Sequence, residues 1–581
     1  MIRTHDCGKL TKKNIGEKVV LCGWVAHRRD HGGVIFVDLR DRYGKTQIVF
    51  DPEISKKAHE IGEKVRGEFV LKIGGKVRAR GAGLENPRMK TGDIEVAADE
   101  IEILNAAKTP PFEIESEKKV REDLRLEFRY LDLRREKMQK NIFLRAKISK
   151  MIRDFFEKND FLDIETPILV KGTPEGSREY LVPSRLHHGK FYVLPQSPQQ
   201  LKQLLMLSGF DKYFQIARCF RDEDQRGDRQ PEFTQFEIEM SFVEQNDILE
   251  ICEKCFVELT EKLAPEKKFQ KVFPRMSWKN AMEKYGSDKP DLRFGMDFQN
   301  LSDAAKNSGF GIFEKSKFLF ALPVAKKYGE LTRKDIDELT EIARQNGAGG
   351  LAWLRVGENS GPVAKNSTPT FLQKVAEKCA AKKGDLIFFG ASGDFSKAVE
   401  PLGAVRSALG DKFHLKNPDE FAYLWVTDFP MFEKKDDGSV GAVHHPFTRP
   451  HPDDENLEKP FEARSIAYDL VLNGVELGGG SLRIHEPTLQ KKIFELLKIS
   501  EHDAEKRFGH LLKAFEFGCP PHGGIAFGLD RVVMLFAGAE NIREVIAFPK
   551  NQVAADLMLG APSEMPKSQI EELGVKIIDD K

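Results

Sequence analysis

Apolar and polar side chains alternate strictly from Phe236 to Phe242. The apolar members are Phe236, Ile238, Met240 and Phe242, and the polar members are Glu237, Glu239 and Ser241. Because successive side chains of a strand point to opposite faces, this period of two predicts a strand with one polar face. A second apolar, strand-like run precedes it at residues 212–220. Such one-sided alternation is typical of an antiparallel sheet.

The connection between these strands, CFRDEDQRGDRQPEF at residues 219–233, is dense in arginines and acids. Two explanations account for this density. The charges form a solvated hairpin tip laced with salt bridges, or they face a ligand that is itself charged. Motifs elsewhere in the chain are needed to choose between these two explanations.

The chain is too long for a single hydrophobic core. Its 581 residues predict three or four domains of about 150 residues each. No apolar run approaches the ~18 residues of a membrane span, and the first residues, MIRTHDCGKL, lack the apolar core of a signal peptide. Seven scattered cysteines fit reduced thiols, so a cytoplasmic protein is expected. Cys252 and Cys255 form one CxxC pair, but their helical surroundings favour packing over metal binding.

Residues 1–107 predict a small β-barrel. Five β-rich runs separated by Gly, Asp and Asn turns, with one helical piece, are typical of a closed barrel of the OB type. Residues 1–50 hold ten basic and five acidic side chains, although the whole chain has a net charge of zero. This module is therefore predicted to touch a polyanion.

Phe36 lies between two pairs of arginines in this basic module, Arg28 with Arg29 and Arg40 with Arg42. OB barrels bind single-stranded nucleic acid by stacking bases on aromatic rings beside basic side chains. The alternative is that Phe36 is a core residue of its strand.

A long amphipathic helix and a strand follow the barrel. The helix carries Ile148, Met151, Ile152, Phe155 and Phe156 on one face. It leads into FLDIETPIL at residues 161–169, a predicted edge or interface strand because it contains Pro167. Residues 288–415 are Gly- and Ala-rich, with short elements and no dense charged motif, and predict an inserted domain. Strand signals then resume and end in GGIAFGLDRVVMLFAG, a strand that breaks at glycine and becomes a helix.

The sequence contains no GxxxxGK[ST] loop and no GxGxxG after a predicted strand, so a bound nucleotide would be held by side chains on a sheet. Arg221 at a strand end and Arg531 in a first helical turn suit this role, because guanidinium pairs bidentately with phosphate. The alternative for each is a salt bridge, to Asp222 or Asp530.

The ELGGGSLR stretch adds Glu476 and Arg483 around three glycines that let a ligand approach the backbone. Glu476 beside a nucleotide could hold Mg²⁺. The alternative is a glycine-rich turn with exposed charges. His444 and His445 form a pair without zinc-site spacing.

Three segments together resemble one family. FLDIETPIL, FRDEDQRGDRQPEFTQFEIEMSF and GGIAFGLDRVVML are similar to motifs 1, 2 and 3 of class II aminoacyl-tRNA synthetases. With QSPQQLKQLLM and HHPFT, and with the same domain order, the chain resembles the bacterial-type aspartyl-tRNA synthetases of subclass b over essentially its full length.

The resemblance implies an α+β multidomain fold that consists of an OB barrel, an antiparallel catalytic sheet and an inserted α+β domain. The implied domains are an anticodon-binding OB fold (1–107), a hinge (108–140), the catalytic domain in two parts (141–287 and 416–551), a GAD-like insertion (288–415) and a C-terminal extension (552–581).

The resemblance also implies the substrates and their sites. ATP would be bound by Arg221, Asp222, Glu223, Gln230, Glu476, Gly528, Leu529, Asp530 and Arg531. Aspartate would be bound by Glu175, Gln199, Gln200, Leu201, Lys202, Arg221, His444, His445 and Arg483. Arg221, Arg531 and Glu476 would be catalytic, and Mg²⁺ would be held by Asp469 and Glu476. Lys202 and Arg483, flanking the substrate carboxylate, would reject asparagine.

The implied partners are tRNA and a second copy of the chain in a homodimer. The anticodon would be read by Arg29, Phe36, Gln47 and Glu95. His31 and Gly83 resemble the non-discriminating type, which aspartylates both tRNA(Asp) and tRNA(Asn). A separate amidotransferase would then amidate the aspartate on tRNA(Asn). The alternatives are an enzyme acting on tRNA(Asp) only, a relative acting on asparagine or lysine, and a non-catalytic tRNA-binding paralogue. The presence of Arg221, Arg531 and Glu476 argues against the paralogue.

Overall fold

The computed structural model describes residues 1–116, 118–172, 177–224, 227–358, 360–435 and 437–578. The chain forms two compact units. The first holds Met1–Lys140 with Ala547–Asn551 and Ala555–Pro562, and the second holds Asn141–Ile546 with Gln552–Ala554 and the C-terminal residues from Ser563. Across the described residues, no helix is both long and apolar enough to cross a membrane.

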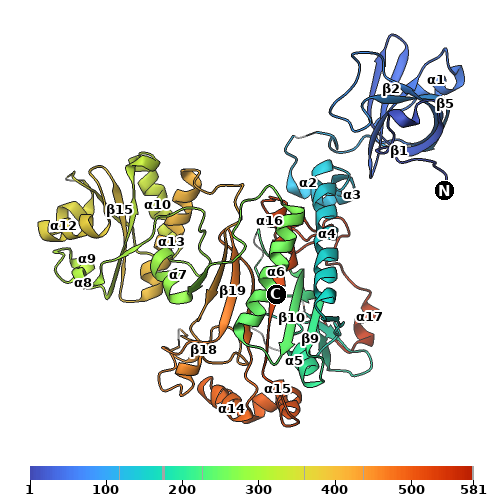
Figure 1. Ribbon diagram of the computed structural model, residues 1–581. Helices are drawn as coiled ribbons and strands as arrows, with labels where there is room; N and C mark the ends of the chain where they lie inside the picture. Colours follow the sequence, from blue (N-terminus) through green and yellow to red (C-terminus); the bar gives the residue numbers. More distant parts are fainter. Residues whose placement is uncertain (117, 173–176, 225–226, 359, 436, 579–581) are drawn as a thin grey trace. The chain divides into compact units, whose positions relative to one another are not determined.

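The first unit contains a closed five-stranded barrel with the strand order β1-β2-β3-β5-β4 (Figure 1). Its elements are η1 (Lys12–Asn14), β1 (Lys18–His31), β2 (Val34–Asp41), β3 (Gly44–Phe50), α1 (Lys56–Gly62), β4 (Val70–Ala79) and β5 (Ile94–Asn105). Inward side chains such as Val19, Val37 and Ile73 are fully buried in one core. This confirms the OB-type barrel expected from the five β-rich runs. The helices α2 (Glu122–Glu127), α3 (Arg129–Asp132) and α4 (Glu136–Lys158) follow.

The second unit is built on an eight-stranded sheet in the order β11-β16-β19-β20-β21-β10-β9-β6. These strands are β6 (Leu162–Asp163), β9 (Lys212–Phe220), β10 (Glu232–Ser241), β11 (Arg275–Ser277), β16 (Tyr423–Thr427), β19 (Ala467–Leu472), β20 (Val475–Leu482) and β21 (His522–Gly528). β9 and β10 pair antiparallel, as their alternation predicts. Only the edge pairs β6–β9 and β11–β16 are parallel among the described strands of this sheet.

Helices α4, α6 (Gln245–Leu263) and α16 (Leu529–Phe536) share one core with this sheet (Figure 1). Phe236 of β10 and Phe527 of β21 stack with ring centroids 4.7 Å apart in that core. Since neighbouring side chains on a strand point to opposite faces, Glu237 and Glu239 face away from these helices. Their face is covered by α5 (Gln199–Leu207), which carries Lys202.

Smaller elements complete the second unit outside the insertion. They are β7 (Leu181–Pro183), β8 (Phe191–Val193), α7 (Trp278–Tyr285), β17 (Phe432–Lys434), β18 (Val440–Ala442), η3 (Pro452–Asp454), α14 (Pro487–Leu496), α15 (Glu501–Phe515), η4 (Ile542–Glu544) and α17 (Lys567–Glu572). The strand predicted at residues 161–169 is shorter than expected, because β6 contains only Leu162 and Asp163. Pro167 has no N–H to donate to a ladder, and it lies beyond the strand.

The insertion has its own four-stranded antiparallel sheet, in the order β12-β13-β15-β14. Its elements are β12 (Gln299–Asn300), α8 (Ser302–Ala305), α9 (Gly311–Glu314), β13 (Phe318–Val324), η2 (Lys326–Tyr328), α10 (Arg333–Gln345), β14 (Ala352–Arg355), α11 (Pro362–Asn366), α12 (Pro369–Lys378), β15 (Leu386–Ser392) and α13 (Phe395–Lys412). Phe388 packs with α10 and α13, and its neighbour Phe389 packs with α9 and α12 (Figure 1). Both faces of the sheet are therefore covered.

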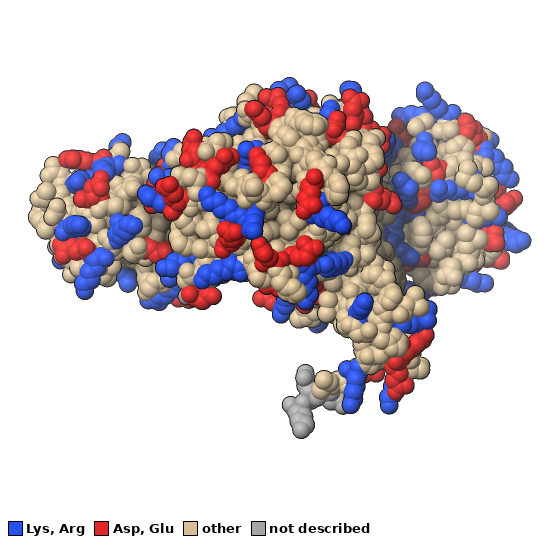
Figure 2. Space-filling model, turned by 90° about the horizontal axis from the view of Figure 1, so that it is seen from below, with Lys and Arg blue, Asp and Glu red and all other residues tan. Residues whose placement is uncertain are grey.

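Charges of both signs are mixed on one face of the molecule. Figure 2 shows lysines and arginines interspersed with acids over the face in view. With a net charge of zero, the chain depends on local sites for any recognition of anions.

Candidate active site

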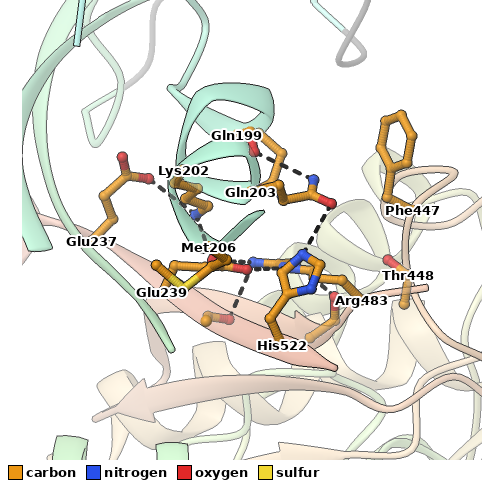
Figure 3. Close-up of polar contacts among 12 residues, drawn as sticks. Gln199, Lys202, Gln203, Met206, Glu237, Glu239, Phe447, Thr448, Arg483 and His522 are labelled. Atoms are coloured by element: carbon orange, nitrogen blue, oxygen red, sulfur yellow. Dashed lines mark hydrogen bonds and ion pairs between the residues drawn. The ribbon is translucent and has the colours of Figure 1, made fainter. Parts of the chain in front are cut away.

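Four buried charged residues form a compact cluster on the polar face of the large sheet (Figure 3). Lys202 Nζ lies 3.1 Å from Glu237 Oε2 and 3.5 Å from Glu239 Oε2. Arg483 follows β20 and holds Glu239 bidentately, with Nε donating to Oε1 at 2.9 Å and Nη2 to Oε2 at 3.1 Å. The two cations thus share one carboxylate.

The shared carboxylate is kept ionised by its partners. Burial alone would raise the pKa of Glu239, but the nearby charges of Arg483 and Lys202 outweigh burial and hold its pKa below the usual value. Glu239 in turn raises the pKa of Arg483 against the opposing effect of burial. Glu239 and Arg483 therefore stay charged although they are shielded from water, which is tolerable only with this close pairing.

Polar neighbours orient the cluster. Tyr213 Oη donates to Glu237 Oε1 at 2.9 Å, and burial raises the pKa of this phenol well above its usual value, so it remains a donor. His445 Nε2 lies 2.9 Å from Arg483 Nη1, and burial lowers the pKa of His445 well below its usual value. His445 is therefore neutral at pH 7 and adds no third buried positive charge.

The remaining residues predicted to bind aspartate lie around this cluster, except Glu175 and Arg221, which lines the neighbouring cleft. Gln199 and Gln200 are buried at the start of α5, and Gln199 Nε2 and Gln200 Oε1 have no hydrogen-bond partner among the described residues. Leu201 is half-buried beside them. Unpaired buried polar atoms are costly unless a ligand satisfies them, so they fit a polar small molecule. Glu175 lies outside the described residues.

His444 is exposed, yet it lies in the same region. Desolvation by the surrounding protein lowers its pKa, and the carboxylates of Glu476 and Asp288 partly oppose this lowering.

Next to the cluster, a cleft of about 240 Å³ is lined by the predicted phosphate-binding residues. The lining includes Arg221, Glu223, Gln230, Glu476, Gly528 and Arg531. Arg221 begins the loop after β9, donates from Nε to Gln196 O at 3.4 Å, and lies over the Phe233 ring at 5.1 Å. Phe233 thereby orients the guanidinium without neutralising it.

The salt bridges considered from the sequence for the two arginines are wrong. Within the described residues Arg221 forms no ion pair with Asp222, whose carboxylate instead lies 3.8 Å from Arg178 Nε. Asp530 accepts from Thr234 N at 2.9 Å and from Arg145 Nη1 at 2.5 Å, so it anchors the start of α16 rather than neutralising Arg531. Arg531 points to the cleft and contacts Asp228 Oδ2 at 3.1 Å and Glu476 Oε2 at 3.9 Å.

The arginine-lined cleft supports the second explanation for the charge density of residues 219–233, in which the charges face a charged ligand. Arg221 and Asp228 from this connection both line the cleft. Leu529, also predicted to bind ATP, buries its side chain in the core of the sheet and is not among the residues that line the cleft.

Asp469 and Glu476 provide the candidate metal site. Asp469 is buried on β19 opposite Gly479, and a Cβ at Gly479 would collide with its carboxylate. Burial, followed by repulsion from Glu476, raises the pKa of Asp469 well above its usual value. A cation would relieve that repulsion, and Mg²⁺ usually binds one or two carboxylates plus phosphates. The two carboxylates therefore fit a magnesium ion. No group of three or more His, Cys, Asp or Glu side chains in the described residues forms a denser metal site.

The predicted anticodon-binding residues gather on one outer face of the barrel. Arg29 Nη2 donates to Gln47 Oε1 at 3.2 Å, and Gln47 Nε2 donates to Glu95 Oε2 at 2.7 Å. Phe36 is opposite Arg29 in the register of β1 and β2, is only half-buried, and does not belong to the barrel core. The alternative in which Phe36 is a core residue is therefore wrong.

The two residues predicted to set tRNA choice lie in exposed parts of the barrel unit. His31 contacts the Phe36 ring edge-on at 6.1 Å between centroids. Gly83 is in a loop and has φ +79°, a conformation that favours glycine.

Sequence reasoning missed several members of the site. They are Glu237, Glu239, Tyr213, Gln196 and Asp228. The polar face of β10 was visible as alternation, but its ion-pair partners come from α5 and from the residue after β20, which are distant in sequence. Asp38 and Arg78 likewise join the barrel face through Arg29 and Glu95.

Comparison with known families supports the family resemblance seen in the sequence motifs. Residues 121–552 match the family described as tRNA synthetases class II (D, K and N). Residues 19–104 match the OB-fold nucleic acid binding domain.

Curated relatives match along the whole chain. The Aspartate--tRNA(Asp/Asn) ligase of Natranaerobius thermophilus is 49% identical over 589 residues, which cover 99% of this chain and 100% of that protein. The protein of the same name from Geobacillus sp. (strain WCH70) is 50% identical over 589 residues, which cover 100% of this chain and 99% of that one.

Solved structures share the fold at low sequence identity. Asparaginyl-tRNA synthetase from Pyrococcus horikoshii, complexed with asparaginyl-adenylate, has a TM-score of 0.60 at 18% identity, covering 94% of this chain and 98% of that one. Aspartyl tRNA synthetase from Entamoeba histolytica has a TM-score of 0.58 at 20% identity, covering 95% and 92%.

Proposed function

Because this chain belongs to the class II tRNA synthetases of the D, K and N group, we propose that it attaches L-aspartate to tRNA. The reaction has two steps. ATP and aspartate first form aspartyl-adenylate and diphosphate, and aspartate then passes to the 3′ end of the tRNA.

The observation that carries the choice of aspartate is the pair of buried cations that share Glu239. A substrate carboxylate placed between Lys202 and Arg483 would accept hydrogen bonds from both cations, in addition to those that they give to Glu237 and Glu239. The amide nitrogen of asparagine is a donor, so it would meet a second donor and leave a buried donor without an acceptor. A site of this kind discriminates between the two substrates by about 10⁴ or more.

The cleft arginines support the adenylation step. Arg221, held by Phe233 and by Gln196 O, is positioned for the α-phosphate while the aspartate α-carboxylate attacks it. Arg531 is positioned for the γ-phosphate, and its ion pairs with Asp228 and Glu476 are loose enough to exchange for phosphate contacts. The protein supplies no nucleophile, and it acts by orienting the reactants and stabilising the developing charge. A Mg²⁺ ion held by Asp469 and Glu476 would supply further positive charge at the phosphates.

The barrel face supports binding of the tRNA anticodon. Phe36 offers a half-exposed ring for base stacking, and Arg29, Gln47 and Glu95 offer donors and acceptors for base edges. We assign both tRNA(Asp) and tRNA(Asn) as substrates from the names of the full-length relatives together with His31 and Gly83. The expected context is a cytoplasmic homodimer whose Asp-tRNA(Asn) is consumed by an amidotransferase.

The test is charging of purified tRNA(Asp) and tRNA(Asn), separately, with labelled aspartate, ATP and Mg²⁺. Charging of both tRNAs is the expected result. Charging of tRNA(Asp) alone would keep the enzyme and overturn the assignment of tRNA(Asn). If neither tRNA accepts aspartate, the proposed activity is wrong.

A further inference from the structure

One buried arginine in the insertion contacts the segment that connects the insertion to the catalytic sheet. Arg406 lies on α13 and is 3% exposed. Its Nη2 donates to Asp291 O at 3.0 Å, Phe294 O at 2.8 Å and Gly295 O at 2.8 Å, and its Nε donates to Gly295 O at 3.1 Å. A buried guanidinium that serves three backbone carbonyls holds that stretch of chain in one conformation.

The face of α13 that carries Arg406 is shaped for this segment, residues 286–295. Gly403, Arg406 and Gly410 are spaced i, i+3 and i+7, so they lie on one side of the helix. A Cβ at Gly403 would collide with Gly286 O, and one at Gly410 would come 2.6 Å from the Phe294 ring. The Arg406 guanidinium lies over the Phe294 ring, at 4.2 Å from its centroid, and over the Tyr285 ring, at 4.6 Å. Burial lowers its pKa only to about 10, so Arg406 remains charged at neutral pH.

The other side of this segment packs on the catalytic sheet. Asp291 lies against Gly474 in the β19–β20 turn, where a Cβ would come 3.1 Å from Asp291 Cβ. Arg293 fixes the Asp291 carboxylate, with Nε 3.0 Å from Oδ1 and Nη2 2.6 Å from Oδ2. Glu476, which lines the nucleotide cleft, follows Gly474 by two residues. Asp288, in the same segment, is close enough to act electrostatically on Asp469.

We propose that Arg406 is a positioning residue for the nucleotide half of the active site, which gives the insertion a role in ATP binding. Arg406 holds residues 286–295 against the β19–β20 turn, and the turn sets the position of Glu476. This inference rests on the proposed function, since Glu476 is assigned there to the ATP site. The core of the aspartate pocket, built from α5, β10 and Arg483, is not part of this series of contacts, although Asp288 acts electrostatically on His444 at the edge of the pocket.

The test compares Arg406→Met with Arg406→Lys and with a control on the same helix. Lys412→Met removes an ion pair of α13 to Asp335, at 2.6 Å, that does not involve the connecting segment. Aspartate-dependent ATP–diphosphate exchange gives KM for ATP and for aspartate, and hydrogen exchange of residues 473–476 gives a readout independent of turnover. Arg406→Met is expected to raise KM for ATP about tenfold, leave KM for aspartate within twofold and speed exchange at the turn. Arg406→Lys is expected to restore part of the loss, and Lys412→Met to change neither KM.

Gly403→Ala provides an independent variant, because its methyl group displaces the segment while Arg406 is kept. It is expected to show the same rise in KM for ATP, and it tests the inference even if Arg406→Met proves insoluble. Unchanged KM for ATP in Gly403→Ala, or equal rises for ATP and aspartate in Arg406→Met, would overturn the inference. Absence of aspartate-dependent exchange in the unmodified protein would instead refute the proposed function itself.

Discussion

The two halves of the active site are built in opposite ways. In the aspartate pocket the charged side chains are buried, with Lys202 and Arg483 only 1% and 2% exposed and each within 3.5 Å of a carboxylate. In the nucleotide cleft the side chains of Arg531, Glu476 and Asp228 are 24%, 37% and 43% exposed, and the ion pairs of Arg531 extend to 3.9 Å.

The difference follows from what each half has to recognise. A small acid must be distinguished from its amide, which requires a rigid, desolvated site whose groups are already in place. A triphosphate offers many charged oxygens, so solvated arginines are sufficient to bind it. Their weak ion pairs with carboxylates are easily replaced by contacts with phosphate. Substitutions in the pocket should therefore affect folding and specificity together, and substitutions in the cleft should affect the reaction alone.

Arg483→Lys should produce the largest effect. The lysine keeps the charge but cannot hold Glu239 bidentately while also contacting His445 and Ser481, as Arg483 does. We expect kcat/KM for aspartate in ATP–diphosphate exchange to fall about 10³-fold, in line with the loss of a buried specific contact. The control is Arg449→Lys, because the ion pairs that Arg449 makes within the described residues, to Glu455 and Glu486 at 3.2 and 3.6 Å, are partly exposed to solvent. Equal small losses in both variants would contradict the rigid pocket.

Arg531→Ala should separate reaction from folding. Removal of one preorganised donor to a developing charge costs about 10² in rate, so we expect that loss in kcat/KM for ATP. The free energy of unfolding should change by less than about 0.5 kcal/mol, because solvated ion pairs contribute little. Chemical denaturation and diphosphate exchange on the same preparation measure both quantities. A large loss of stability would show that the cleft is as tightly coupled as the pocket.

Glu239→Gln should change how the free energy of unfolding depends on pH. A carboxylate whose pKa is lowered on folding contributes stability above the usual carboxyl pKa of about 4.3, and this is lost as pH falls through the lowered value. We expect the variant to be less stable by about 2 kcal/mol at pH 7, with the difference shrinking below about pH 4. Urea unfolding between pH 3 and pH 7 measures it, and Glu100→Gln, at an exposed position, is the control. A difference that stays constant with pH would mean that Glu239 is not held ionised by Lys202 and Arg483.

Much of this organisation could be predicted from local pattern. The five barrel strands, the β9–β10 pair, the strand-to-helix break before Arg531 and the position of Arg221 at a strand end are all encoded in short stretches. The ion pairs could not be predicted in this way, because they depend on which strands become neighbours. Lys202, Glu239 and Arg483 are brought together only by α5 over β10 and by the end of β20. The segment around Pro167 shows that local pattern can also predict too much. Its apolar residues predicted a strand over 161–169, but Pro167 has no N–H to donate, and the strand ends at Asp163.

The most direct test of the whole account is ATP–diphosphate exchange by the unmodified protein with aspartate and with asparagine as alternative substrates. It requires no tRNA and reports on the pocket and the cleft together. We predict exchange with aspartate and a kcat/KM for asparagine that is lower by about 10⁴ or more. Comparable exchange with asparagine, or exchange with neither amino acid, would contradict the assignment of Lys202 and Arg483 as the carboxylate-binding pair.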